Sequence, residues 1–182
     1  AKQYHEITYE DYDNLNLNEF PKVGDKLSYL EETSSGEKHP IPLGSTLPYF
    51  HQGTVRVRQK KFKFKGALAS DNIKDIGIYA HYFLNSPYLW GGKSHAGLDC
   101  SALVQLVFQN YDKRFPRNSV EQFKSSLLKT SSEDKLGKGT LIFWKGHVAI
   151  AINKKEIVHS NAYHMKVAIE KSLYKYLSNF RL

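Results

Sequence analysis

The hydrophobic and polar positions along the chain change their period near residue 66. Before that point, short apolar runs alternate with polar residues and are separated by turn formers. A period of two is typical of half-buried strands. The expected strands are 26–30, 54–58 and 62–65, with a turn at 34–37 and a hairpin connection at 59–61. The pattern predicts a small all-β domain over residues 1–66.

After residue 66 the apolar residues recur three and four positions apart, which is the spacing of an amphipathic helix. The three expected stripes are Ile73, Ile76, Ala80 and Phe83, capped by Asp71 or Asn72; Cys100, Leu103, Val104, Val107, Phe108 and Tyr111; and Val120, Phe123 and Leu127. Four strand-like segments follow at 140–144, 147–152, 156–159 and 165–169. Three helices followed by four strands predict an α+β domain with an antiparallel sheet over residues 67–182.

Composition supports a folded protein, since hydrophobic residues make up 41% of the 182 residues and aromatic residues 13%. The apolar runs are all shorter than the ~20 residues that a membrane helix needs, so we expect no membrane span. The formal net charge is +8. Six cations fall in residues 56–65, a pattern that fits either an anionic-polymer surface or the solvated face of an edge hairpin. We favour the second interpretation and expect no nucleic-acid partner.

Cys100 is the single cysteine, which excludes an internal disulfide framework and any multi-cysteine metal site. It stands where the second helical stripe begins. Unpaired backbone N–H groups and the helix dipole at such a position favour a thiolate, the nucleophilic form of cysteine. A buried and inert cysteine is the alternative reading of this position.

His147 and His159 lie in two expected strands joined by a turn at 153–155. Their residue numbers add to 306. If facing residues in the hairpin add to 306 or 308, the two rings share one face of the sheet as opposite or diagonal neighbours. His147 can then accept the thiol proton of a cysteine while His159 holds its ring. A zinc site made with Cys100 is the alternative, but the spacing matches no common zinc signature and we expect no metal.

Several blocks in a fixed order then resemble a known family. They are residues 87–92 (PYLWGG), 97–104 (GLDCSALV), 115–119 (FPRNS) with Gln122, 139–144 (GTLIFW), 146–150 (GHVAI) and 157–160 (IVHS). Together they span about residues 70–170 and resemble the NlpC/P60 cysteine peptidases, which are papain-like enzymes acting on bacterial peptidoglycan peptides. One departure is Ala102, where the family usually has glycine.

The resemblance implies a role for each matching residue. Cys100 would be the nucleophile, His147 the base and His159 the third, polar member. Tyr88 would donate to the developing oxyanion together with a backbone N–H at Cys100, or else be a half-buried core tyrosine. Trp90 would serve as packing or as a groove wall. The family reaction requires no metal and no organic cofactor.

One branch of the family carries a bacterial SH3-like barrel before the catalytic domain, and residues 1–66 resemble such a barrel in strand pattern and position. That branch cuts the bond between γ-D-glutamate and a diamino acid in peptides with a free N-terminal L-alanine. Asp99, Ser101 and Ser119 match the positions that receive the ammonium group, although Asp99 and Ser119 also suit helix caps. Candidates for a further acidic contact from the first segment are Glu31, Glu32 and Glu37.

The expected function is therefore hydrolysis of peptidoglycan-derived peptides by a monomeric cysteine peptidase in cell-wall turnover or recycling, in the cell envelope or periplasm rather than the cytoplasm. Three alternatives stay open. The chain could be an endopeptidase on intact wall peptides, a papain-like acyltransferase, or a non-catalytic wall-binding module. Loss of the cysteine or of the histidines would mark the last of these, and all three residues are present.

Overall fold

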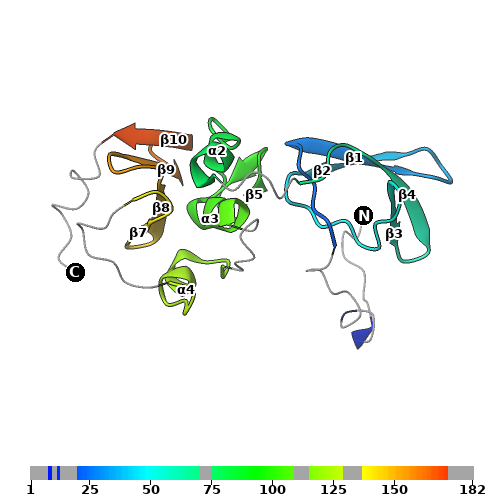
Figure 1. The fold of residues 1–182 in the computed structure, drawn as a ribbon, viewed down its shortest axis with the longest axis horizontal. Coiled ribbons are helices and arrows are strands. Elements are labelled where there is room, and N and C mark those ends of the chain that lie inside the picture. Colours follow the sequence, from blue (N-terminus) through cyan, green and yellow to red (C-terminus); the bar gives the residue numbers. More distant parts are fainter. Residues whose placement is uncertain are drawn as a thin grey trace. The chain divides into compact units, whose positions relative to one another are not determined.

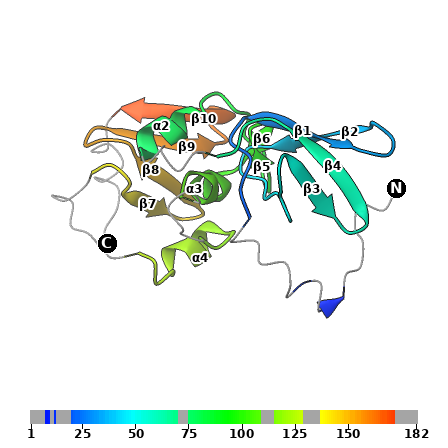
Figure 2. The same cartoon turned by 45° about the vertical axis from the view of Figure 1, so that its right-hand side comes forward.

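The computed structural model describes residues 8–9, 12, 20–69, 75–108, 115–128 and 137–171. The chain divides into two compact units, Ala1–Ala69 and Ser70–Leu182, whose elements are labelled in Figure 1 and seen from a second direction in Figure 2. The division follows Ala69, whereas the hydrophobic pattern puts it after residue 66.

The first unit contains a four-stranded antiparallel sheet with strand order β2-β1-β4-β3. Its strands are β1 (Leu27–Glu32), β2 (Lys38–Pro42), β3 (Thr54–Val57) and β4 (Lys60–Lys65). Val23, Leu47 and Val55 are completely buried and form its core. The expectation of short strands is confirmed for residues 20–69, and the resemblance of this unit to an SH3 barrel stays a prediction.

The hairpin of β3 and β4 is tighter than expected. Val57 pairs with Lys60, so the connection is only Arg58 and Gln59, and the expectation that 59–61 form the connection is wrong. Arg58 has a φ of 55°, which suits the two-residue turns that match strand twist. Val55 and Phe62 are buried while the cations of this stretch are exposed. The basic alternation is thus the outer face of a half-buried sheet.

The second unit combines short helices with a four-stranded antiparallel sheet of order β10-β9-β8-β7. Its elements are α2 (Ile76–His81), β5 (Lys93–Ser94), β6 (Gly97–Leu98), α3 (Cys100–Phe108), α4 (Ser119–Phe123), β7 (Leu141–Trp144), β8 (His147–Ala151), β9 (Glu156–Asn161) and β10 (Lys166–Lys171). Helix α3 contacts β8, β9, α2 and α4, and Figure 1 shows it beside the sheet. The predicted α+β organisation is confirmed here.

Helix α3 is central because apolar residues occupy almost its whole circumference. Leu103, Val104 and Val107 are at most 1% exposed, and a helix that is apolar all round belongs inside a domain. Its predicted extension to Tyr111 lies outside the described residues, as does Ile73. Helix α2 begins at Ile76 with Asp75 as its N-cap, so the predicted cap at Asp71 or Asn72 is wrong. Among the described residues, no helix has both the length and the apolar character needed to cross a membrane.

Helix α4 corrects the third predicted stripe. Val120 and Phe123 are 56% and 66% exposed, whereas Gln122 is completely buried. The Gln122 side-chain amide donates to the backbone oxygens of Ser101 and Pro116, both at 2.9 Å. The buried face of this short helix is therefore polar, and its amide contacts the carbonyl of Ser101 in the first turn of α3 and that of Pro116 in the preceding loop.

Candidate active site

Cys100 is the first residue of α3, as the sequence predicts, and is 8% exposed. Asp99 caps the helix: its carboxylate accepts a 2.9 Å hydrogen bond from the backbone N–H of Ala102, and its carbonyl accepts one of 3.1 Å from Leu103. This is the usual geometry of an aspartate N-cap. The cap places the cysteine in the first turn, where backbone N–H groups are unpaired.

The electrostatics of the thiol differ from the sequence-based expectation. Burial raises the pKa of the Cys100 thiol above its ordinary value of 9.0, and the carboxylate of Asp99 acts in the same direction. The backbone N–H groups of Val148, Ser101 and Cys100 itself lower it, but by less. The helix start therefore does not make a free thiolate at neutral pH. A neighbouring base has to take the thiol proton.

The contact with Val148 also shows where the Cys100 sulfur lies. The backbone N–H of Val148 is close enough to the Cys100 thiol to lower its pKa, and Val148 is the residue after His147 in β8. The sulfur thus lies against the beginning of β8.

The two histidines share one face of the sheet. Ile150 pairs with Val158 and Ala151 with Ile157, so facing residue numbers add to 308, the diagonal arrangement. Nε2 of His147 is 2.9 Å from Nδ1 of His159. The predicted placement of the two rings on one face is confirmed, and their role as a proton relay stays a prediction.

Burial controls the charge of both rings. It lowers the pKa of His147 from 6.5 to about 4, with a smaller contribution in the same direction from His159. Burial also lowers the pKa of His159, although a hydrogen bond with Glu170 opposes this. His147 is therefore neutral at physiological pH, the state in which a histidine can accept a proton.

Glu170 is a site residue that the sequence reasoning missed. Its Oε1 lies 2.9 Å from Nε2 of His159 and 2.9 Å from Nε2 of His164. In the β9–β10 pairing, His159 faces Ala168, so Glu170 is its diagonal neighbour on the same face. The strand predicted at 165–169 ends one residue before Glu170. Continuing its alternation of faces by one more residue would have placed this carboxylate on the side of His159.

Arg117 is the second residue that was missed. It donates to both carboxylate oxygens of Asp99, at 2.8 and 2.7 Å, and to Ser101 Oγ at 3.0 Å. Burial favours the neutral acid, but the hydrogen bonds from Arg117 and from the backbone N–H groups of Ala102 and Gly91, together with the charge of Arg117, keep the pKa of Asp99 below its ordinary value. The same carboxylate also accepts from Ser101 Oγ and the Gly91 N–H. Asp99 and Ser101 are thus engaged within the protein around the nucleophile.

The other predicted site residues take different positions. Tyr88 is half-buried, and burial raises the pKa of its hydroxyl, with further contributions from the charges of Cys100 and Asp99. This interaction places the hydroxyl within electrostatic range of Cys100. Trp90 is 82% exposed and does not pack in the core. Ser119 is half-buried at the first position of α4, where Asn118 rather than Ser119 is the N-cap.

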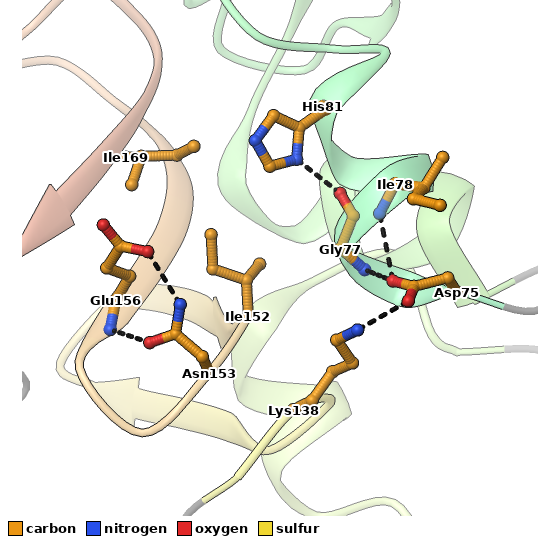
Figure 3. Close-up of a pocket in the computed structure, with 9 residues that line it drawn as sticks. All are labelled: Asp75, Gly77, Ile78, His81, Lys138, Ile152, Asn153, Glu156 and Ile169. Atoms are coloured by element: carbon orange, nitrogen blue, oxygen red, sulfur yellow. Dashed lines mark hydrogen bonds and ion pairs between the residues drawn. The ribbon is translucent and has the colours of Figure 1, made fainter.

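A cavity of about 370 Å³ in the second unit contains none of these residues. Figure 3 shows it between α2 and the turn after β8, with the Lys138–Asp75 ion pair at 2.6 Å on one side. Ile152 lines it at the end of β8, whereas His147 begins that strand. This cavity is separate from the cysteine and histidine cluster.

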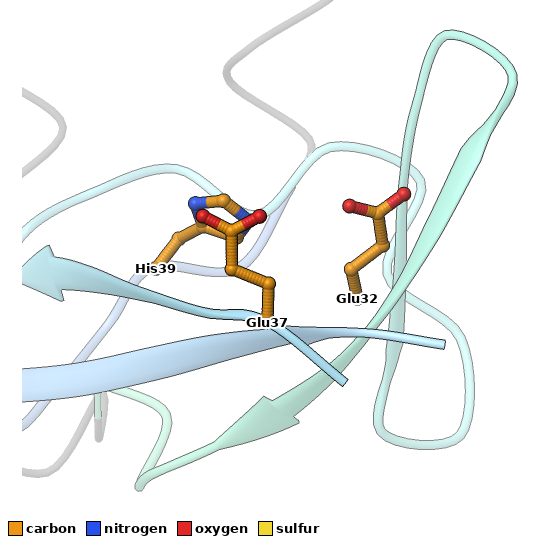
Figure 4. A group of neighbouring side chains, drawn as sticks. All are labelled: Glu32, Glu37 and His39. Carbon is orange, nitrogen blue, oxygen red and sulfur yellow. The ribbon is translucent and has the colours of Figure 1, made fainter. Parts of the chain in front are cut away.

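Glu32, Glu37 and His39 bring three potential metal ligands together in the first unit (Figure 4). Lys60 forms a 3.0 Å ion pair with the Glu32 carboxylate, and Ser34 and Ser35 donate to it at 2.9 and 3.3 Å. The carboxylate is already neutralised by a cation. The group is therefore better described as an ion-paired turn than as a metal site.

Comparisons with known proteins converge on one family. The model of the NlpC/P60 family matches residues 85–180, more than half of the chain. The chain is 32% identical over 100 residues to a γ-D-glutamyl-L-lysine dipeptidyl-peptidase of Bacillus cereus, covering 50% of this chain and 28% of that protein. It is 35% identical over 81 residues to dipeptidyl-peptidase 6 of Lysinibacillus sphaericus, covering 43% and 29%.

A crystal structure of an NlpC/P60 family protein from Bacillus cereus has the same fold, with a TM-score of 0.74, 23% identity, and coverage of 91% of this chain and 61% of that one. The chain spans less than a third of the length of each of the two dipeptidyl-peptidases. The match over residues 85–180 includes the helix that begins at Cys100 and all four strands of the sheet. The chain belongs to the NlpC/P60 family.

Proposed function

We propose that the second unit is a cysteine peptidase that hydrolyses the bond between γ-D-glutamate and a diamino acid in peptidoglycan-derived peptides. The observation that carries the proposal is the hydrogen-bonded pair of His147 and His159 in the strands next to the buried Cys100. A relative named as a γ-D-glutamyl-L-lysine dipeptidyl-peptidase supports the choice of bond.

The chemistry follows from the charge states. Cys100 and His147 are both neutral at rest, because burial raises the pKa of the thiol and lowers that of the imidazole. His147 takes the thiol proton as the sulfur attacks the γ-glutamyl carbonyl. The resulting imidazolium protonates the departing amine, which leaves a thioester on Cys100. Water then hydrolyses the thioester with His147 again as base.

The negative charge that develops on the carbonyl oxygen needs donors in a site with little water. The backbone N–H of Cys100 at the start of α3 is one, and the Tyr88 hydroxyl is the other. The raised pKa of Tyr88 keeps this hydroxyl protonated and able to donate.

Selection of peptides with a free N-terminal L-alanine requires an acceptor for an ammonium group. Asp99, Ser101 and Ser119 are assigned this role in the proposal. The assignment of Asp99 rests on its matching position, because its carboxylate already accepts from Arg117, Ser101 and two backbone N–H groups. Ser119 lies in the same segment of chain as Arg117, and its hydroxyl supplies a polar contact.

The test is turnover of L-Ala-γ-D-Glu-L-Lys and of its diaminopimelate analogue, each with a free or acetylated N-terminus, followed by mass spectrometry. Wild type should release L-Ala-D-Glu from the free peptides. Cys100→Ala and His147→Gln should reduce turnover by about 10³-fold or more, as loss of a nucleophile or base does in related triads. His81→Gln, an exposed histidine beside the separate cavity, is the matched control and should retain activity.

Undiminished turnover by Cys100→Ala would overturn the nucleophile assignment. Equal cleavage of acetylated peptide and of intact sacculi would favour an endopeptidase on the wall, as the name of a Haemophilus influenzae relative, "probable endopeptidase", suggests for that protein. Transfer of the acyl group to an added amine in place of hydrolysis would identify an acyltransferase.

A further inference from the structure

Glu170 lies behind the histidine pair, on the side of His159 that faces away from His147. Its carboxylate is at 2.9 Å from Nε2 of His159. The side chain of His159 is 5% exposed and that of Glu170 is 20% exposed. The contact is therefore sheltered from water, where a charge-assisted hydrogen bond is strong.

This contact determines where the protons sit. An ionised carboxylate only accepts hydrogen bonds, so the nitrogen that faces Glu170 carries the N–H. His159 is neutral at rest because burial lowers its pKa, and its Nδ1 is therefore a bare lone pair. That lone pair accepts from Nε2–H of His147, 2.9 Å away. His147 is then left with a bare Nδ1, the nitrogen that can receive a thiol proton.

Asn161 favours the opposite arrangement. Its Nδ2 is 2.9 Å from the same Nε2 of His159, and its Oδ1 accepts a 2.7 Å hydrogen bond from the backbone N–H of His164. An amide held in this orientation would donate to a bare Nε2, which would move the His159 proton to Nδ1. The proton of His147 would then sit on Nδ1 and block the base.

We propose that Glu170 is a positioning residue that overrides Asn161, holds the proton of His159 on Nε2 and thereby leaves Nδ1 of His147 free as the base. The proposal rests on the function proposed above. During the reaction, the positive charge on His147 is stabilised by the Nδ1 lone pair of His159, whose single N–H, on Nε2, donates to the Glu170 carboxylate. In this proposal Glu170 contacts neither the substrate nor the Cys100 sulfur.

Long-range ¹H–¹⁵N spectra of the resting protein test the proton positions without any substrate. In wild type both His147 and His159 should show the Nε2–H tautomer. In Glu170→Ala, His159 should change to the Nδ1–H tautomer under the control of Asn161, while Glu170→Gln, which is expected to turn its carbonyl to the ring, should retain Nε2–H. An Nδ1–H tautomer of His159 in wild type, or no change in Glu170→Ala, would overturn the proposal.

Kinetics supply the second readout. Glu170→Ala should lower kcat by about 10- to 100-fold, the size of effect seen when a metal-bound histidine loses its outer hydrogen-bond partner, with KM changed less than about twofold. Glu170→Gln should lie between Glu170→Ala and wild type. The matched control is Glu156→Ala, which removes the same charge from a residue that pairs with Lys171 and therefore lies on the other face of the sheet from Glu170, and it should not change kcat.

The outcomes separate the two proposals. A wild-type protein that shows the expected tautomers but cleaves none of the peptides would contradict the proposed function and leave the role of Glu170 in place. A wild-type protein that cleaves the peptides, together with a fully active Glu170→Ala variant, would contradict the role of Glu170 alone.

Discussion

At the scale of single residues, the site is controlled by burial. The same low-polarity surroundings raise the pKa of Cys100 and lower that of His147. Each group is thereby kept neutral, which under the proposed function makes the pair a general-base system in its resting state instead of a preformed ion pair. Both pKa shifts oppose transfer of the thiol proton to the imidazole before substrate binds.

The alkylation rate of Cys100 should report this state. We expect slow inactivation by iodoacetamide at neutral pH and a rate that still rises beyond pH 9, because the pKa of the thiol is above its ordinary value of 9.0. A rate that reaches a plateau at acidic pH would instead indicate a preformed thiolate–imidazolium pair. Cys100→Ala, which should incorporate no label, is the control for other reactive groups.

The pH dependence of turnover should show the lowered pKa of His147. The acid limb of kcat/KM should fall well below the ordinary histidine value of 6.5, toward about 4, since the base has to be neutral in the free enzyme. Activity should thus stay nearly constant between about pH 5 and 8. A midpoint near 6.5 would contradict the assignment of a buried base.

At the scale of elements, short helices hold in place the loop segments that contain the proposed site residues. Helix α4 has little apolar surface to bury, and its contribution is the hydrogen bonding of Gln122 to the carbonyls of Ser101 and Pro116. These bonds connect the segment of Arg117 to the first turn of α3. Arg117 in turn anchors the Asp99 cap. The start of α3 therefore depends on a polar network.

Substitution of Gln122 should weaken this connection. Gln122→Leu removes the amide that donates to the Ser101 and Pro116 carbonyls, and the loss of a buried hydrogen-bond partner costs about 1–3 kcal/mol. We expect a fall of a few kcal/mol in the free energy of unfolding measured with urea. Glu121→Leu, an exposed neighbour on the same helix, should change stability by less than about 0.5 kcal/mol. Equal stability of the two variants would show that the buried amide is dispensable.

At the scale of the whole molecule, the burial of two neutral histidines makes the free energy of unfolding of the second unit depend on pH. A histidine whose pKa is lowered by folding binds fewer protons in the native state than in the unfolded state between the two pKa values. For His147 that interval runs from 6.5 down to about 4. Its contribution to stability is complete above pH 6.5 and is lost as the pH falls toward 4.

Acid should therefore destabilise the wild-type protein more than a variant without this ring. The free energy of unfolding should fall by about 1–3 kcal/mol between neutral pH and about pH 5, and His147→Asn should remove much of that fall. His51→Gln, at an exposed histidine of the first unit, should leave it unchanged. Chemical denaturation at both pH values measures the difference, and identical pH dependence in wild type and His147→Asn would refute the linkage.

Much of the architecture was determined by local patterns. The period-two runs predicted β3 and β4, and the apolar stripe predicted α3 with Cys100 at its start. The even sum of their residue numbers predicted that His147 and His159 share one face. Such features depend on periods of 2.0 and 3.6 residues, which each stretch of chain expresses by itself. The exposed face of α4 was not predictable in this way, because burial of Gln122 depends on carbonyls elsewhere in the chain.

Only the tertiary structure decided the charge states and the hydrogen-bond partners. Cys100 stands at a helix start, which by itself favours a thiolate, yet burial against β8 raises its pKa. Arg117 and Glu170 have no signature beyond a single charge, and each is recognised only when the fold brings it to Asp99 or to His159. The sequence by itself therefore determined which residues can do the chemistry, since periodicity and motifs are local. Their proton positions were decided by desolvation and by contacts between distant segments, which exist only after folding.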